Sequence, residues 1–368
     1  MTRSKSAEAT PAVTIEGETF SSPPQRIEYP AIDVPEPGEF ATVAPGILWL
    51  RIPMPMDLNH INLWLLEDND GWTLVDSGLN ADMCKEAWAK LESKLFALRR
   101  LKRIFITHLH PDHVGLARWL QEKHKAIAWM SVRGLEMVQS FLSEPTPADI
   151  TAAEEFMHSH GYADTANLAR FFSGKMYRTN VSGVPEIAHS PQDGDEIDIG
   201  ATQWRIYETD GHAEGHQCLF DASRRILISG DQVLPTISSN VSRLPRSRDT
   251  NPLASYLNSL ERLSQLDAHT LVLPSHGRPF YGLRPRASDL IAHHREHLAT
   301  LQAACSEPRT AFELVPVLFK RRLIDAHWMF AMGETIAHAE YLLQAGKLVR
   351  QIDGEGTIRY LHEVNGEQ

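Results

Sequence analysis

Four residues that can bind metal ions lie within six positions of the chain, in the segment THLHPDHVG: His108, His110, Asp112 and His113. The apolar run LKRIFI directly before them is typical of a buried strand. A loop that leaves the end of a strand can direct the first two side chains to one metal ion and the last two to a second ion about 3.5–4 Å away. Because imidazole and carboxylate ligands suit zinc, iron and manganese, the segment predicts a metal site without naming the metal.

Three other segments also place histidine or aspartate directly after an apolar run. TDGHAEGHQC offers His212 or His216, LISGD offers Asp231, and LVLPSHG offers His276. Side chains at the ends of neighbouring strands can meet along one edge of a fold, so we expect these residues to share the site of THLHPDHVG.

Two cations that share one water molecule lower its pKa toward neutrality and yield a hydroxide nucleophile. Asp112 is the predicted catalytic group that orients this water or accepts its proton. Asp231 is predicted to be the second catalytic carboxylate. A cation also stabilises the negative charge that develops on a carbonyl oxygen during attack. The expected reaction class is therefore hydrolysis.

The elements that must position these residues form two β-rich series. GILWLRIPM, HINLWLLED and GWTLVDSG belong to the first, and DEIDIGATQWRIYETDG, QCLFDASRRILISGD and AHTLVLPSHG belong to the second. Predicted helices lie between and after them. The pattern favours an α+β fold with two packed sheets covered by helices, an αββα sandwich. We expect a mobile tail over residues 1–25, a catalytic domain over 26–286 and a C-terminal domain over 287–368.

Two segments differ from this pattern. Residues 133–177 carry apolar side chains at helical spacing, interrupted by SEPTP, and predict a helical insertion. Residues 287–368 predict three helices and a terminal hairpin, which describes a winged-helix-like module. This module has eight basic and eleven acidic residues, a composition that disfavours nucleic-acid binding. The histidines of HHREH, His293, His294 and His297, are interpreted as a polar helix face, not as a third metal site.

The composition of the chain limits its class and its partners. A chain of 368 residues with 42% hydrophobic and 23% charged positions can bury a full core. Its net charge of −11 argues against nucleic-acid binding through bulk electrostatics. Cys84, Cys218 and Cys305 are too few and too widely spaced for a disulfide framework or a thiolate zinc site. We expect a cytoplasmic protein without a membrane segment, which can associate as a homo-oligomer.

Taken in chain order, the motifs LVDSG, THLHPDHVG, GHAEGH, LISGD and LPSHG resemble those of the metallo-β-lactamase superfamily, over about Phe40 to Arg286. The resemblance implies two metal ions, with zinc expected and iron or manganese compatible. It implies that His108, His110 and His212 bind the first ion, that Asp112, His113 and His276 bind the second, and that Asp231 bridges them. It also implies that Asp76 braces the metal-binding loop, and we expect His216 to support the ligands without binding metal.

The substrate is predicted from residues near the motifs. Asp231 stands where thiolate-bearing lactamases have cysteine, which disfavours antibiotic hydrolysis, and the continuation after His276 is unlike that of glyoxalase II enzymes. Two loops carry arginines that can bind phosphate or carboxylate bidentately: Arg243, Arg246, Arg248, Arg278, Arg284 and Arg286. With an apolar cap from the insertion, they favour an anionic small molecule with an apolar acyl part, in particular a thioester such as acyl-CoA. Lactone hydrolysis stays open, as does RNA cleavage or nucleic-acid binding through the winged helix.

Overall fold

Two β-sheets form the centre of the fold in the computed structural model, which describes residues 23–362 except 57, 98, 321 and 325. Most of the tail expected over residues 1–25 therefore lies outside the described residues. The first sheet has the order β1-β2-β3-β4-β5-β6-β7, and the second has the order β12-β11-β10-β9-β8. The strands of the first sheet are β1 (Phe40–Ala44), β2 (Ile47–Pro53), β3 (His60–Asp68), β4 (Gly71–Val75), β5 (Arg100–Phe105), β6 (Ile127–Trp129) and β7 (Ile187–His189). Those of the second are β8 (Glu196–Ile199), β9 (Thr202–Glu208), β10 (Gln217–Asp221), β11 (Ile226–Gly230) and β12 (Leu271–Pro274).

The alternation of side chains along the strands determines which face each sheet buries. In β2, Trp49 joins the core between the two sheets, whereas Leu50 packs into the core beneath the outer helices. In β11, Ile228 likewise faces the other sheet and Leu227 faces the helices on the outside. Both faces of each sheet are therefore buried, and the predicted αββα sandwich is confirmed.

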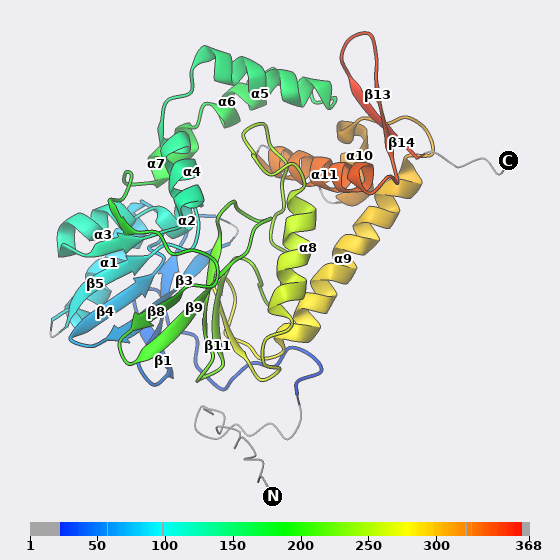
Figure 1. The fold of residues 1–368 in the computed structure, drawn as a ribbon. Helices are drawn as coiled ribbons and strands as arrows, with labels where there is room; N and C mark the ends of the chain where they lie inside the picture. The colour runs from blue at the N-terminus through cyan, green and yellow to red at the C-terminus, as the bar shows by residue number, and fades with distance from the viewer. Residues whose placement is uncertain (1–22, 57, 98, 321, 325, 363–368) are drawn as a thin grey trace, which may run out of the picture.

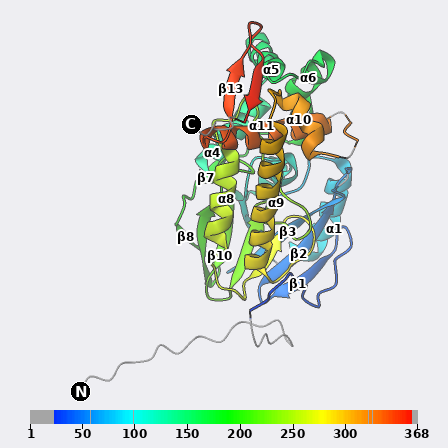
Figure 2. The same ribbon diagram turned by 90° about the vertical axis from the view of Figure 1, so that its right-hand side faces the viewer.

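Helices cover the two outer faces (Figures 1 and 2). On the first sheet lie α1 (Asp82–Leu95), the short α2 (Pro111–Val114) and α3 (Ala117–His124). On the second sheet lie α8 (Pro252–Leu263) and the long α9 (Leu283–Ala304). Figure 2 shows α8 and α9 side by side on this face.

The predicted helical insertion consists of α4 (Val132–Leu142), α5 (Pro147–Ser159), α6 (Thr165–Phe172) and α7 (Lys175–Asn180). The C-terminal part contains α10 (Ala311–Leu318), α11 (Ala326–Gln344) and the hairpin of β13 (Val349–Ile352) and β14 (Ile358–Leu361). Figure 1 shows α5 and α6 reaching over α11, and Tyr162 of the insertion contacts the rings of Phe312 and Trp328. The insertion and the C-terminal part therefore pack on one another beyond one end of the sandwich.

The sheet topology brings particular strand ends together. β4 pairs in parallel with β5, and β11 pairs in parallel with β12, so the carboxyl ends of each pair lie at the same edge. The buried side chain of Asn62 joins the two sheets at this edge. It accepts a hydrogen bond from Trp49 Nε1 (2.8 Å) and donates to the carbonyls of Pro274 (2.9 Å) and Gly277 (3.0 Å). The loop after β12 is thereby fixed to β3.

The core between the sheets should dominate the stability of the sandwich. Ile228 is completely buried there, so Ile228→Ala removes its contacts and leaves a cavity, and we expect the free energy of unfolding to fall by about 2–5 kcal/mol. Ile127→Ala is the matched control, because this side chain is 45% exposed on β6. Urea unfolding measures both variants, and equal losses of stability would contradict the assignment of the core.

Candidate metal centre

The seven residues predicted to bind metal lie together at the edge where the strand ends meet. Two groups follow from the structure, which we call the first triad (His108, His110 and His212) and the second triad (Asp112, His113 and His276). Within each triad the ligand atoms lie within 4.8 Å of one another, and the same holds for His108, His113 and Asp231. The loop after β5 and the start of α2 supply four of the seven residues, and the chain after β9, β11 and β12 supplies the others.

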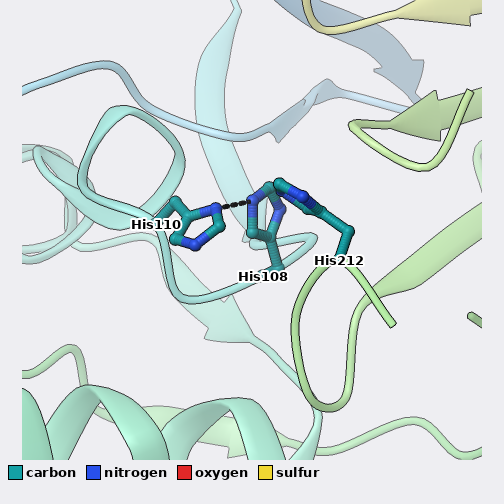
Figure 3. Close-up of side chains that lie close together, drawn as sticks. All are labelled: His108, His110 and His212. Atoms are coloured by element: carbon teal, nitrogen blue, oxygen red, sulfur yellow. Dashed lines mark hydrogen bonds between the residues drawn. The ribbon is translucent and has the colours of Figure 1, made fainter. Parts of the chain in front are cut away.

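In the first triad the three imidazole rings lie close together in edge-to-face arrangements (Figure 3). His108 Nε2 lies 2.9 Å from His110 Nδ1. The ring centroid of His212 is 5.0 Å from that of His108 and 4.6 Å from that of His110. Because three imidazoles from two distant loops converge on one small volume, they form a three-nitrogen donor set of the kind that zinc accepts.

Asp231 lies between the two triads. Its Oδ1 is 3.5 Å from His113 Nε2 and 3.4 Å from His276 Nε2, whereas its Oδ2 is 3.6 Å from His212 Nε2. Asp112 Oδ2 approaches the same two nitrogens of the second triad, at 3.4 Å and 3.3 Å. The carboxylate of Asp231 therefore presents Oδ1 to the second triad and Oδ2 to the first, which is the arrangement that a bridging ligand requires.

Three of the imidazoles are held by a hydrogen bond from Nδ1 to an oxygen outside the metal ligands. Each such bond fixes the ring and leaves Nε2 facing the centre, as in the outer shells of known metal sites. The bonds run from His113 to Asp76 Oδ2 (2.7 Å), from His212 to the carbonyl of Asn240 (2.8 Å), and from His276 to the carbonyl of His60 (2.9 Å).

Asp76 is placed to brace the loop that carries four of the ligands. It follows β4 directly and adopts a left-handed φ of +64°, a conformation that costs energy for a residue other than glycine. Its carboxylate accepts hydrogen bonds from the Thr107 amide (2.8 Å) and the Thr107 hydroxyl as well as from His113. Thr107 Oγ1 in turn lies 3.0 Å from His108 Nδ1. Asp76 therefore positions ligands of both triads through direct contact and through Thr107.

His216 lies behind the ligands. Its Nε2 accepts a hydrogen bond from the Asp231 amide (3.2 Å), and its Nδ1 lies 2.8 Å from Thr209 Oγ1. Gly230 makes this approach possible, because a Cβ atom at that position would lie 2.4 Å from His216 Nε2. His216 thus fixes the backbone at Asp231, while His212 supplies the nitrogen that faces the first triad.

The donor atoms fit bound cations. Among the described residues, His113 Nε2, His212 Nε2 and Asp231 Oδ1 are buried and have no hydrogen-bond partner. Buried polar atoms without partners are costly, and here they face one another across the two triads. Divalent cations would satisfy all three. The first triad with one oxygen of Asp231 could hold one ion, and the second triad with the other oxygen could hold another.

The two triads differ in charge. Burial and the neighbouring imidazoles lower the pKa of His110 to about 3 and that of His108 well below its usual range, so both rings offer lone pairs at neutral pH. Burial alone would also lower the pKa of His276, but the carboxylates of Asp231 and Asp112 raise it to about 10. Burial also opposes protonation of His113, but the carboxylates of Asp112, Asp76 and Asp231 together raise its pKa. Without metal, protons on the second triad compensate the carboxylates.

A cavity of about 120 Å³ opens beside the first triad. His110 and His212 line it, together with Met137 and Phe141 of α4 and with Phe330 of α11. The insertion and the C-terminal part thus both contribute apolar walls next to the metal ligands. Leu244 and Arg246, from the loop after β11, complete this side of the cavity.

Of the six arginines predicted to bind substrate, Arg246 lines the cavity. Its guanidinium lies 5.8 Å from the ring centroid of Phe141 and donates to the carbonyl of Ser140 (3.3 Å). The other five arginines do not line the cavity. Each donates hydrogen bonds to other groups: Arg243 to the carbonyls of Leu244 and Ser247, Arg248 to Glu136, Arg278 to the carbonyls of Pro30 and Ile32, Arg284 to the carbonyl of Ser264, and Arg286 to the carbonyls of Leu234 and Ile237.

Several residues that position the site were not singled out from the sequence. Asn62 and the carbonyls of His60 and Asn240 act through contacts between distant segments, for which a single sequence carries no signal. Thr107 could have been noticed, because it lies within the THLHPDHVG motif next to a ligand. Phe330 is on a helix far along the chain, and its place at the cavity depends on how α11 packs.

Removal of the carboxylate between the triads should reduce metal binding. Asp231→Asn keeps the size of the side chain but removes its charge, so we expect the purified protein to lose at least one bound metal ion per chain. Asp289→Asn, an exposed position on α9, is the matched control and should keep the full complement. Elemental analysis of protein purified without chelators measures both, and an unchanged metal content in Asp231→Asn would contradict a bridging role.

The protons on the second triad predict how metal binding depends on pH. Because the raised pKa values of His113 and His276 keep both rings protonated near pH 7, an incoming cation must displace about two protons per chain. Affinity should therefore rise as the pH increases toward 10. Titration calorimetry of metal-free protein in two buffers of different ionisation enthalpy counts the released protons. A release close to zero would show that the rings are already deprotonated.

Comparisons with known proteins agree with this geometry. Residues 56–276 match the family model of the metallo-β-lactamase superfamily, and residues 298–363 match that of the metallo-β-lactamase-like C-terminal domain. The crystal structure of a β-lactamase domain protein from Burkholderia ambifaria is 39% identical, with a TM-score of 0.84, and the match covers 92% of this chain and 98% of that one.

Curated relatives show the same likeness at lower identity. The probable metallo-hydrolase YqjP of Bacillus subtilis is 28% identical over 80% of this chain and 92% of its own. The human acyl-coenzyme A thioesterase MBLAC2 is 27% identical over 64% of this chain and 79% of its own. No helix in the described ranges is both long and apolar enough to cross a lipid bilayer. The chain belongs to the metallo-β-lactamase superfamily and is a metal-dependent hydrolase of that superfamily.

Proposed function

We propose that the protein is a dinuclear thioesterase that hydrolyses acyl thioesters of a phosphorylated carrier such as acyl-CoA. The observation that carries this proposal is the cavity next to His110 and His212, which combines an apolar wall with the guanidinium of Arg246. A substrate with an apolar acyl group and a distant anionic group matches both features. The likeness to a human acyl-coenzyme A thioesterase supports the same substrate class.

In this proposal the first triad and the second triad each hold one cation, with Asp231 between them. When bound, two divalent cations would lower the pKa of a water molecule and polarise the carbonyl of the substrate. The carboxylate of Asp112 lies within the second triad, where it can orient the attacking water and accept its proton. Because a thiolate is a good leaving group, the chain needs no strong acid beside the sulfur.

The acyl group would lie against α4 and α11. Met137 and Phe141 face the cavity from one side and Phe330 faces it from the other. Such walls exclude water and favour alkyl groups over polar ones. A cavity of about 120 Å³ holds only the part of a long acyl chain nearest the thioester, so a longer chain would extend out between these helices.

Arg246 is the proposed contact for a phosphate of the carrier. Within the described part of the chain, its guanidinium donates one hydrogen bond, to the carbonyl of Ser140, which leaves most of its N–H donors for a ligand. Arg278 and Arg286 each donate to two backbone carbonyls and hold loops in place. We therefore assign phosphate binding to Arg246 and a structural role to these two arginines.

Loss of Arg246 should weaken the binding of the carrier without changing the chemical step. We expect Arg246→Ala to raise KM for acyl-CoA by about 5- to 20-fold, as for the loss of a charge-assisted hydrogen bond, with kcat little changed. KM for an acyl thioester of N-acetylcysteamine, which has no phosphate, should stay the same. Arg284→Ala removes an exposed arginine outside the cavity wall and serves as the matched control.

The same enzyme preparation tests the alternatives. Metal-loaded protein would be assayed with acyl-CoA, acyl-glutathione, lactones and single-stranded RNA. Preferred turnover of acyl-CoA supports the proposal. Preferred turnover of lactones, or cleavage of RNA alone, would overturn the thioesterase assignment while leaving the metal centre intact. An equal rise in KM for both thioesters in Arg246→Ala would overturn the phosphate contact.

A further inference from the structure

A second cluster of metal-binding side chains lies between α9 and α11, apart from both triads. It consists of His294 on α9 and of Glu334 and His338 on α11. The sequence predicted a polar helix face at His294, but this side chain and that of His338 are completely buried, and Glu334 is 8% exposed. The polar face expected from HHREH is therefore wrong for His294.

The geometry of the cluster suits a metal ion. Glu334 and His338 are four residues apart, so both side chains project from the same face of α11. His294 Nδ1 lies 3.1 Å from His338 Nε2. The ligand atoms of all three residues lie within 4.8 Å of one another, as they do in the two triads.

The protonation of the imidazoles leaves nitrogen lone pairs in the cluster. His338 Nδ1 donates to the carbonyl of Glu334 (2.7 Å), so its Nε2 carries a lone pair when the ring is neutral. His294 Nε2 is buried and has no hydrogen-bond partner among the described residues.

We propose that His294, Glu334 and His338 bind a further divalent cation, with zinc favoured by two imidazoles and one carboxylate. The ion would join α9 to α11, so its role would be structural. His297 lies beside the cluster, with its ring centroid 5.6 Å from that of His338. Its Nδ1 is buried and has no hydrogen-bond partner within the described part of the chain, but His297 does not belong to the group whose ligand atoms lie within 4.8 Å of one another.

The cluster is connected to the catalytic centre through one residue. Asn240 Nδ2 donates to Glu334 Oε2 (3.3 Å), and the Asn240 carbonyl accepts the hydrogen bond from Nδ1 of His212 in the first triad. Phe330, which lines the cavity, is on the same helix as Glu334 and His338. A cation in the cluster would therefore hold α11 in the position that both the cavity and His212 require.

The competing interpretation is a hydrogen bond without metal, in which His294 Nδ1–H donates to His338 Nε2. The two interpretations differ in zinc content. We expect His338→Gln and Glu334→Gln each to bind one zinc ion per chain fewer than wild-type protein after purification with zinc and removal of excess ion. Asp289→Asn, at an exposed position on the same helix outside the cluster, should match the wild type. Unchanged zinc content in both cluster variants would overturn the proposal.

A second measurement keeps the proposal testable if one of the cluster variants fails to fold. Zinc would be titrated into metal-free Asp231→Asn protein, whose catalytic centre has lost the ligand between the triads while the cluster is intact. Adding His294→Gln, Glu334→Gln or His338→Gln to this background should remove one zinc equivalent, and Asp289→Asn should remove none. If every folded double variant binds as much zinc as Asp231→Asn alone, the cluster does not bind metal. Because these readouts count zinc and do not use a substrate, they are independent of the thioesterase assignment.

Discussion

The structure depends on one constraint: imidazole nitrogens and carboxylate oxygens are buried together with their lone pairs directed at the same small volume. Atoms such as His212 Nε2 and Asp231 Oδ1 have no hydrogen-bond partner among the described residues, and leaving them so would be costly. The Nδ1 bonds to Asp76, Asn240 and the carbonyl of His60 prevent the rings from turning away. The protein thus holds an arrangement that fits divalent cations.

Different parts of the fold position the metal ligands and line the cavity beside them. The two sheets provide a rigid edge at which parallel strand ends lie side by side, and Asn62 fixes the loop after β12 to β3. The insertion and the C-terminal part do not supply the triads, but Phe141 and Phe330 line the cavity beside them. The metal centre is therefore built by the sandwich, and the surface offered to a substrate is built by the two segments that pack beyond it.

Much of this could be predicted from the sequence, because each candidate ligand follows an apolar strand and strand ends meet at an edge. The spacing alone left His212 and His216 open, since they are four residues apart in one loop, and it was the family resemblance that favoured His212. The roles of the arginines could not be predicted from the sequence for a different reason. Arg278 and Arg286 bind backbone carbonyls of distant segments, which their spacing in the sequence does not reveal. The burial of His294 depends on how α9 and α11 pack, so it could not be predicted from the sequence either.

The central claim is that the seven side chains hold two cations that share the carboxylate of Asp231. Anomalous diffraction at the zinc absorption edge, from crystals of zinc-loaded protein, tests it most directly. The account predicts one peak enclosed by the first triad and one enclosed by the second triad, on either side of Asp231 and about 3.5–4 Å apart. A map with no density between these residues, or with a single ion bound away from Asp231, would contradict it.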